Sequence, residues 1–180
     1  MKSSYNNSIT YKELIDGIIF VKNPKKIVEF GILEGLSLTS FVENSVPTCQ
    51  INAYDIFEEF NGNSANKKQL LEQFSKYKNV NIEYGDFYNK YKDIIDNSID
   101  IIHIDIANNG ETYEYAINNY ISKLTKNGIM IIEGGSEERD NIEWMNKYNK
   151  PKIKQVIEKY SNKYTFKTIG NIPSITLIHP

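Results

Sequence analysis

Acidic residues recur at the ends of apolar runs in this sequence, and this repetition could support chemistry. Four short apolar runs are followed at once, or after one glycine, by Asp55, Asp86, Asp105 and Glu133. A carboxylate can accept hydrogen bonds from sugar or substrate hydroxyls, and two close carboxylates can share a proton or a cation. Single aspartates are common in turns and helix caps, but four at successive run ends favour one common site.

A glycine-containing segment follows the first apolar run and suits a ligand that lies against the backbone. It reads Glu29-Phe30-Gly31-Ile32-Leu33-Glu34-Gly35-Leu36-Ser37, so three residues separate its two glycines. This spacing differs from the G-x-G-x-x-G of dinucleotide-binding folds and from the P-loop. The segment has no Lys or Arg and contains Glu34. We therefore expect its ligand to present no pyrophosphate here.

The elements that must position these residues alternate between strands and helices. Apolar patterning predicts strands over residues 26–30, 51–55, 80–84, 99–104, 129–132, 164–169 and 174–178. Helices are predicted over residues 11–20, 35–43, 67–77, 113–124 and 151–160, and Gly170-Asn171 predicts a hairpin. Short apolar strands that alternate with helices are typical of a Rossmann-like α/β fold with a doubly wound, mostly parallel sheet.

Length and composition bound the remaining classes. We expect one domain over residues 1–180, with an N-terminal helical segment over 1–24 and a Rossmann-like core over 25–180. The 180 residues are 40% hydrophobic and 24% charged, which is ordinary for a globular fold. The single cysteine, Cys49, excludes an internal disulfide and a multi-cysteine zinc site. With 21 basic against 23 acidic residues, nucleic acid is not an expected partner.

No targeting or membrane segment is visible in the sequence. Residues 1–7 are polar, and the apolar run over residues 17–21 is too short and too late for a secretory signal. No stretch approaches the roughly 18 apolar residues of a membrane helix. We therefore expect a cytoplasmic protein with no membrane partner, acting as a monomer or a homodimer.

Four segments, taken in order, resemble the motifs of class I S-adenosylmethionine-dependent methyltransferases. They are residues 29–37, Ala53-Tyr54-Asp55-Ile56-Phe57-Glu58, Gly85-Asp86-Phe87 and Ile102-His103-Ile104-Asp105. Within that class the chain is most similar to small-molecule and sugar O-methyltransferases of the macrocin type. The resemblance covers about residues 26–133. It implies a seven-stranded sheet with a C-terminal hairpin whose last strand is antiparallel.

The resemblance implies that S-adenosylmethionine is the cofactor and that the glycine segment holds its methionine part. Gly31 and Gly35 would face the methionine, and Glu29 or Ser37 would help hold its amino-acid end.

The next two acidic ends suit the nucleoside part of that cofactor. Asp55 ends the second strand, where an acidic residue accepts ribose hydroxyls in nucleotide-binding α/β folds. Asp86 and Phe87 would bracket the adenine, because a carboxylate can accept from the exocyclic amine and a ring can stack. Phe87 could equally be a core residue.

The last two acidic ends are the candidates for catalysis. Asp105, with Glu133 or His103 beside it, would remove the proton of an acceptor hydroxyl. In metal-dependent relatives the residue matching Asp105 binds a metal together with two aspartates after the fifth strand, where this chain has Glu133-Gly134. Asp105 and Glu133 could hold Mg²⁺ with waters. We nevertheless expect no metal ligand and metal-independent chemistry.

Three further side chains lie near these acidic residues in the sequence and could contact a substrate. Tyr113 and Glu111 follow Asp105 closely and are expected to reach a substrate. Arg139, the only arginine, is expected in a surface ion pair with Glu137 or Asp140 rather than as a substrate clamp.

The sequence thus predicts an enzyme that transfers a methyl group to a small-molecule acceptor, most simply at a hydroxyl. The alternative is a non-catalytic module that binds the cofactor or a partner and has a decayed acceptor site, since the metal-site aspartates are missing. An NAD-dependent oxidoreductase is disfavoured by the glycine spacing.

Overall fold

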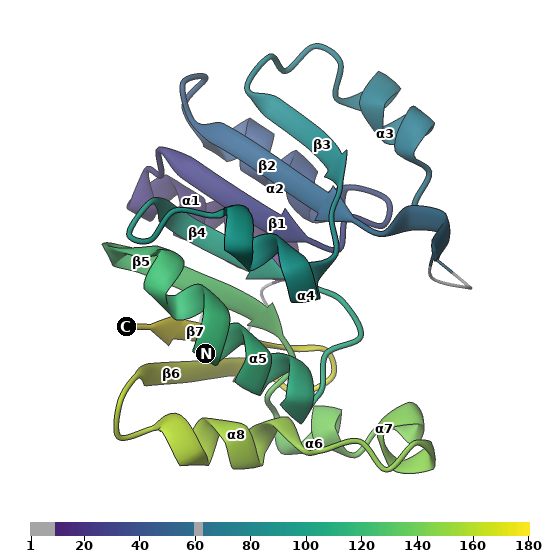
Figure 1. Cartoon of the computed structure of the whole chain (residues 1–180), viewed down its shortest axis with the longest axis vertical. Helices are drawn as coiled ribbons and strands as arrows, with labels where there is room; N and C mark the ends of the chain where they lie inside the picture. The colour runs from purple at the N-terminus through teal and green to yellow at the C-terminus, as the bar shows by residue number, and fades with distance from the viewer. Residues whose placement is uncertain (1–9, 60–62) are drawn as a thin grey trace, which may run out of the picture.

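The computed structural model describes residues 10–59 and 63–180. Within them, strands form one seven-stranded sheet in the order β3-β2-β1-β4-β5-β7-β6 (Figure 1). The strands are β1 Lys26–Phe30, β2 Gln50–Asp55, β3 Val80–Tyr84, β4 Ile99–Ile104, β5 Leu124–Glu133, β6 Thr165–Gly170 and β7 Ser174–His179. Strands β1 to β5 are parallel, and β7 is antiparallel to both β5 and β6. The predicted Rossmann-like sheet with an antiparallel C-terminal hairpin is confirmed.

Helices cover both faces of this sheet. They are α1 Tyr11–Lys22, α2 Leu36–Asn44, α3 Lys67–Gln73, α4 Phe87–Lys90, α5 Gly110–Tyr120, α6 Glu137–Asp140, α7 Glu143–Lys147 and α8 Ile153–Tyr160. In Figure 1, α1 and α2 lie behind the sheet, whereas α4 and α5 lie in front of it.

The core is divided between the two faces because strand residues alternate in direction. On β1, Ile27 packs with residues of α1, α2 and α3, whereas its neighbour Val28 packs with residues of α5 and α8. The same alternation occurs on β4, where Ile101 belongs to the cluster of Ile27 and Ile102 belongs to the cluster of Val28. Burial on both faces explains why most residues of these two strands are apolar.

The region before β5 differs from the prediction. The helix expected over residues 113–124 is α5, which begins at Gly110 and ends at Tyr120, and β5 begins at Leu124 rather than at Ile129. The β4–β5 pairing shifts between Ile99 and Ile101, so that Asn127-Gly128 lies within an irregular stretch of β5 and not in a turn between two elements. An Asn-Gly pair occurs both in turns and in irregular strands, so the sequence alone did not distinguish the two.

Side-chain hydrogen bonds fix the N-terminal part of α1. Thr10 forms a capping box with Glu13, in which the Thr10 hydroxyl accepts from the Glu13 backbone and the Glu13 carboxylate accepts from the Thr10 backbone at 2.8 Å. Asp16 then accepts from Lys12 and from Asn44 of α2, each at 2.8 Å. These contacts tie the start of α1 to α2. Among the described residues, no helix is long and apolar enough to cross a membrane.

Candidate functional site

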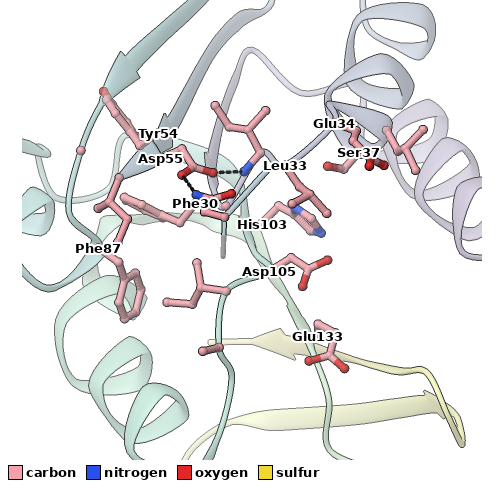
Figure 2. Close-up of a pocket in the computed structure, with 18 of the residues that line it drawn as sticks. Phe30, Leu33, Glu34, Ser37, Tyr54, Asp55, Phe87, His103, Asp105 and Glu133 are labelled. Carbon is pink, nitrogen blue, oxygen red and sulfur yellow. Dashed lines mark hydrogen bonds between the residues drawn. The ribbon is translucent and has the colours of Figure 1, made fainter. Parts of the chain in front are cut away.

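A cavity of about 770 Å³ opens at the carboxyl ends of β1 to β5. This is where the strand order reverses between β1 and β4, the usual place for ligands in doubly wound sheets. The predicted site residues that line the cavity are Gly31, Ser37, Asp55, Asp86, Phe87, His103, Asp105 and Glu133. In Figure 2, Tyr54, Asp55 and Phe87 lie on one side of it, and Asp105 and Glu133 on the other. Glu29 and Gly35 are outside the lining.

The two glycines of the first loop fit against protein atoms. Gly31 has a φ of +86°, and a Cβ built on it would lie 2.0 Å from the carbonyl oxygen of Asp105. Gly31 therefore lets the β1 loop touch the end of β4, and it lines the cavity as well. Gly35 has a φ of +78°, and its Cβ would lie 2.8 Å from the Phe74 ring. The structure places Gly35 behind the cavity wall, where it allows α2 to start close to α3.

Glu29 is fully buried beneath the loop and joins two cavity residues. Its Oε1 accepts a hydrogen bond from the Ser37 hydroxyl and lies 3.0 Å from Nδ1 of His103. Its Oε2 has no partner among the described residues, and neither has the buried Ser40 hydroxyl. Because unpaired buried acceptors are costly, this cluster can bind a donor such as the ammonium of an amino-acid group.

His103 lies beside this cluster, on the same side of β4 as Asp105. Burial lowers the pKa of His103, but the hydrogen bond that its ring donates to Glu29 and the charges of Glu29 and Asp105 outweigh burial, so the pKa is raised above 6.5. Only 4% of its surface is exposed, and its ring packs edge-on against Phe41 at 5.5 Å. Its contacts are those of a buried, hydrogen-bonded histidine at the cavity floor.

Asp55 holds the protein's own loops at the end of β2 (Figure 2). Its Oδ2 accepts from the Ile32 backbone at 2.8 Å, and its Oδ1 accepts from the Phe57 backbone and from the Asn63 side chain, both at 2.7 Å. A carboxylate offers about four acceptor positions, so three are already used. A ribose could take the last one and would compete with Asn63 for another.

Asp86 and Phe87 follow β3 and close the same side of the cavity. Asp86 caps α4 by accepting from the Tyr88 backbone at 2.9 Å and also accepts from Asn89 at 2.6 Å. Phe87 is 4% exposed and stacks on Tyr120, with ring centroids 5.0 Å apart and planes 10° apart. Phe87 is therefore a core residue that also presents part of its ring to the cavity.

Asp105 and Glu133 follow adjacent strands whose last paired residues are Ile104 and Ile132. Asp105 is exposed within the cavity, and its carboxylate has no hydrogen-bond or ion-pair partner among the described residues. Burial raises the pKa of Glu133, the charge of Asp105 raises it further, and Arg139 opposes both. The negative charge of Asp105 thus acts on Glu133 in the same cavity.

Arg139 corrects an expectation. It is 6% exposed and forms a two-pronged ion pair with Glu133, with Nε–Oε1 at 2.5 Å and Nη2–Oε2 at 2.8 Å. Its guanidinium also lies over the Trp144 ring at 5.5 Å. The prediction of a surface pair with Glu137 or Asp140 is wrong, because the turn of Gly134-Gly135 folds α6 back over the end of β5. Glu137 pairs instead with Lys154 at the surface.

Tyr113 and Glu111 do not reach the cavity. Tyr113 is fully buried, and its hydroxyl donates to the carbonyls of Ile132 and Glu133 at 3.2 Å each. Glu111 is exposed and lies 3.8 Å from Lys150. The expectation that these two side chains contact a substrate is wrong, since α5 turns them toward the core and toward solvent.

Tyr11 is a cavity residue that the sequence did not single out. It lines the cavity from the first position of α1, and its hydroxyl is buried without a partner in the described part of the chain. The sequence gives no local signal for Tyr11, because the chain has 13 tyrosines. Helical spacing also does not predict which part of the fold the end of a helix contacts.

A divalent cation does not fit the residues at the ends of β4 and β5. Both oxygens of Glu133 are engaged by Arg139, and the next residue is Gly134. In residues 10–59 and 63–180, no group of three or more His, Cys, Asp or Glu side chains is arranged to hold a metal. The fixed guanidinium supplies a positive charge to Glu133.

A cavity at the switch point of a doubly wound sheet, bounded by a glycine loop and a row of carboxylates, defines a ligand-binding α/β protein. A family model described as a methyltransferase domain matches residues 28–133 of this chain. This match spans more than half of the 180 residues. The chain belongs to this methyltransferase family, and the predicted resemblance is confirmed at that level.

Solved structures share the fold at low sequence identity. A Podospora anserina methyltransferase with bound S-adenosylhomocysteine is 16% identical, with a TM-score of 0.69 over 96% of this chain and 79% of that one. A Bacillus cereus O-methyltransferase in complex with S-adenosylhomocysteine is 16% identical, with a TM-score of 0.67 over 99% and 84%. The O-methyltransferase TomG of Streptomyces achromogenes, in complex with S-adenosylmethionine, is 13% identical, with a TM-score of 0.66 over 96% and 81%. Among curated protein sequences, none matches this chain.

Proposed function

We propose that this protein transfers a methyl group from S-adenosylmethionine to a hydroxyl of a small-molecule acceptor. The observation that carries the proposal is a single cavity that joins a buried cofactor-type cradle to an unpaired carboxylate, Asp105. Family membership and the fold shared with O-methyltransferases support it. A sugar acceptor, as in the macrocin-type resemblance, is one member of this class.

The residues of the first three strands fit S-adenosylmethionine. Glu29 and Ser40 offer unpaired buried atoms for its amino-acid end, reached past the loop at Gly31. Asp55 would accept from the ribose, and Asp86 with Phe87 would bound the adenine. When bound, S-adenosylmethionine supplies a methyl group on a positively charged sulfur, and the acidic cavity favours such a charge.

The ends of β4 and β5 would handle the acceptor. Asp105 would accept the hydrogen bond of the acceptor hydroxyl and hold its proton. Arg139 keeps Glu133 fixed and neutralised, so that a single net negative charge faces the acceptor. His103 would support Glu29 through its Nδ1, and Asp105 is the better placed base, because its carboxylate is exposed in the cavity whereas His103 is 4% exposed. Alignment of two bound molecules in one cavity supplies much of the rate in such a transfer.

The experiment that tests the proposal separates binding from chemistry. Calorimetry with S-adenosylhomocysteine is expected to show binding to the wild type and equal binding to Asp105→Asn. Formation of S-adenosylhomocysteine from S-adenosylmethionine with a panel of hydroxyl acceptors should fall about 10²–10⁴-fold in Asp105→Asn. Asp93→Asn, a change at an exposed residue paired with Lys90, is the matched control and should have wild-type activity.

Two outcomes would contradict the proposal in different ways. If the wild type binds the cofactor but no acceptor gives turnover, the chain is the non-catalytic binding module that the missing aspartates suggested. If it binds neither S-adenosylmethionine nor S-adenosylhomocysteine, the cofactor assignment itself is wrong.

A further inference from the structure

The hydroxyl of Tyr11 is a buried polar group in the cavity that the proposed function has not used. It lines the same cavity as Asp105, Glu133 and Ile175. Its Oη is buried and forms no hydrogen bond within residues 10–59 and 63–180. Buried hydroxyls nearly always have a partner, so an unpaired one in a cavity indicates a place for a ligand atom.

The helix that carries Tyr11 holds this hydroxyl in place. Tyr11 follows the capping residue Thr10, whose box with Glu13 closes the helix end. One turn later, Asp16 binds Asn44 of α2 at 2.8 Å. A side chain on an anchored helix turn is better suited to orient a ligand than one on a loop.

The hydroxyl is a donor under ordinary conditions. Burial raises the pKa of Tyr11, and the charges of Glu133 and then Asp105 raise it further, while Arg139 opposes them in part. The phenol therefore keeps its proton at neutral pH. Because no hydrogen bond joins it to either carboxylate, that proton is available to an oxygen of a ligand.

The charges around Tyr11 restrict the ligand. Arg139 is paired with Glu133, and His103 is paired with Glu29. Lys12, the one lysine in the described lining, contacts Asp16 at 2.8 Å and Glu43 at 3.4 Å. Asp105 by contrast has no partner. An anion bound here would meet an unpaired carboxylate and no unpaired cation, which is unfavourable.

We propose that Tyr11 binds the methyl acceptor by donating a hydrogen bond to one of its oxygens, and that this acceptor is an uncharged or cationic hydroxyl compound rather than an anion. The inference rests on the proposed function and names the substrate class of the same site. Apolar side chains beside Tyr11, Ile15 and Ile175, suit a hydrophobic scaffold for that acceptor. Tyr11 is an acceptor-binding residue, distinct from Asp105, which holds the reacting proton.

Three probes that share one dihydroxyphenyl ring test both parts of the inference. They are catechol, which is uncharged, dopamine, which is cationic, and 3,4-dihydroxybenzoate, which is anionic. Each is titrated by ligand-detected NMR into protein saturated with S-adenosylhomocysteine, for the wild type, Tyr11→Phe and the control Tyr148→Phe. Tyr148 is 62% exposed and lies outside the cavity lining.

The wild type should bind catechol and dopamine about tenfold or more tightly than the benzoate. Tyr11→Phe should weaken catechol binding about tenfold, the effect of one lost hydrogen bond. Its affinity for S-adenosylhomocysteine should equal that of the wild type, and Tyr148→Phe should change neither affinity.

Four results would overturn the inference. They are equal binding of the benzoate, unchanged catechol binding in Tyr11→Phe, a lowered affinity of Tyr11→Phe for S-adenosylhomocysteine, and no binding of any probe to the saturated wild type. The third would place Tyr11 at the cofactor instead. If the wild type failed to bind S-adenosylhomocysteine at all, the proposed function would fall first, and calorimetry shows this independently.

Discussion

The two sides of the cavity differ in how their carboxylates are satisfied. At the ends of β2 and β3, Asp55 accepts three hydrogen bonds and Asp86 accepts two, all from the protein itself. At the ends of β4 and β5, Asp105 accepts none from the described residues, and Glu133 is held by a buried arginine.

This difference indicates that the first side of the cavity maintains its shape, whereas the second side supplies the groups that can react with a ligand. The carboxylates on the first side hold loops in the form that a cofactor would need, so most of their binding capacity is used before any ligand arrives. The second side keeps two groups without a protein partner among the described residues, the carboxylate of Asp105, which is exposed in the cavity, and the buried phenol of Tyr11. We therefore expect substitutions on the first side to alter stability and cofactor affinity together, and those at Asp105 and Tyr11 to alter only chemistry or acceptor binding.

The largest effect is expected where the two sides meet, at Gly31. In Gly31→Val the new Cβ would lie 2.0 Å from the Asp105 carbonyl oxygen, a backbone atom that cannot move aside cheaply. Urea unfolding should show a loss of about 3 kcal/mol or more, together with loss of cofactor binding. Gly17→Ala in α1 is the control, since its Cβ meets nothing within 4 Å, and it should gain about 0.5–1 kcal/mol. A Gly31→Val protein of normal stability that only fails to bind cofactor would show that this glycine serves the ligand and not the junction.

The sequence predicted the parts of the molecule that local patterns control. The bounds of β1, β3 and β4 agree with the prediction because each is a short segment of strand-forming residues closed by Gly or Asp. The clustering of Asp55, Asp86, Asp105 and Glu133 followed from one rule, that parallel strands end at the same edge of a sheet.

The sequence could not predict contacts made across long separations. Glu133 and Arg139 are six residues apart, but their ion pair depends on two glycines with φ above +100° and on the packing of α6 against α8. Tyr11 reaches a cavity built from residues far along the chain. That Gly31 is required by the Asp105 backbone is likewise invisible before the sheet is assembled.

On the second side, the ion pair of Glu133 should dominate stability. Arg139→Met would leave a mostly buried carboxylate without its cation, and we expect a loss of about 3 kcal/mol in urea unfolding. Arg139→Met combined with Glu133→Gln should recover part of that loss, because the uncompensated charge is gone. Lys154→Met is the matched control; its exposed pair with Glu137 should contribute at most about 0.5–1 kcal/mol. Equal losses in the two single variants would mean that the buried pair is no stronger than a surface one.

On the first side, Asp55→Ala should weaken S-adenosylhomocysteine binding by about 1–3 kcal/mol in calorimetry, the scale of lost hydrogen bonds to a charged group. It should also lower stability, since three donors lose their acceptor. Asn63→Ala sharpens the test, because it frees one position of Asp55 at the cavity and should leave cofactor affinity equal or higher. If Asn63→Ala binds as weakly as Asp55→Ala, the aspartate acts only by holding the loop.

Between the two sides, His103 should give a smaller, pH-dependent effect. Its pKa is raised in the folded state, so its contribution to stability is complete below pH 6.5 and is lost as the pH rises through the folded-state value. The free energy of unfolding of the wild type should therefore decline across that window, and His103→Gln should flatten the decline. His179→Gln, a change at the other histidine and next to the chain end, should leave the decline intact. A decline that persists unchanged in His103→Gln would assign it to other groups.

The smallest effect is expected from removing metal. If a divalent cation joined Asp105 and Glu133, chelation would abolish methyl transfer and Mg²⁺ would restore it. The structure gives Glu133 to Arg139 and leaves too few oxygen ligands for a tight site, which normally needs about six. Turnover with any acceptor that reacts should therefore stay within about twofold of its starting value in EDTA, and added Mg²⁺ should not raise it. The same assay on Arg139→Met is a stricter test, because this variant frees both Glu133 oxygens. A magnesium requirement that appears only in this variant would show that the guanidinium occupies the position of a cation. A wild type that loses activity in EDTA and regains it with Mg²⁺ would refute metal independence. It would also refute the inference that Arg139, and not a cation, neutralises Glu133.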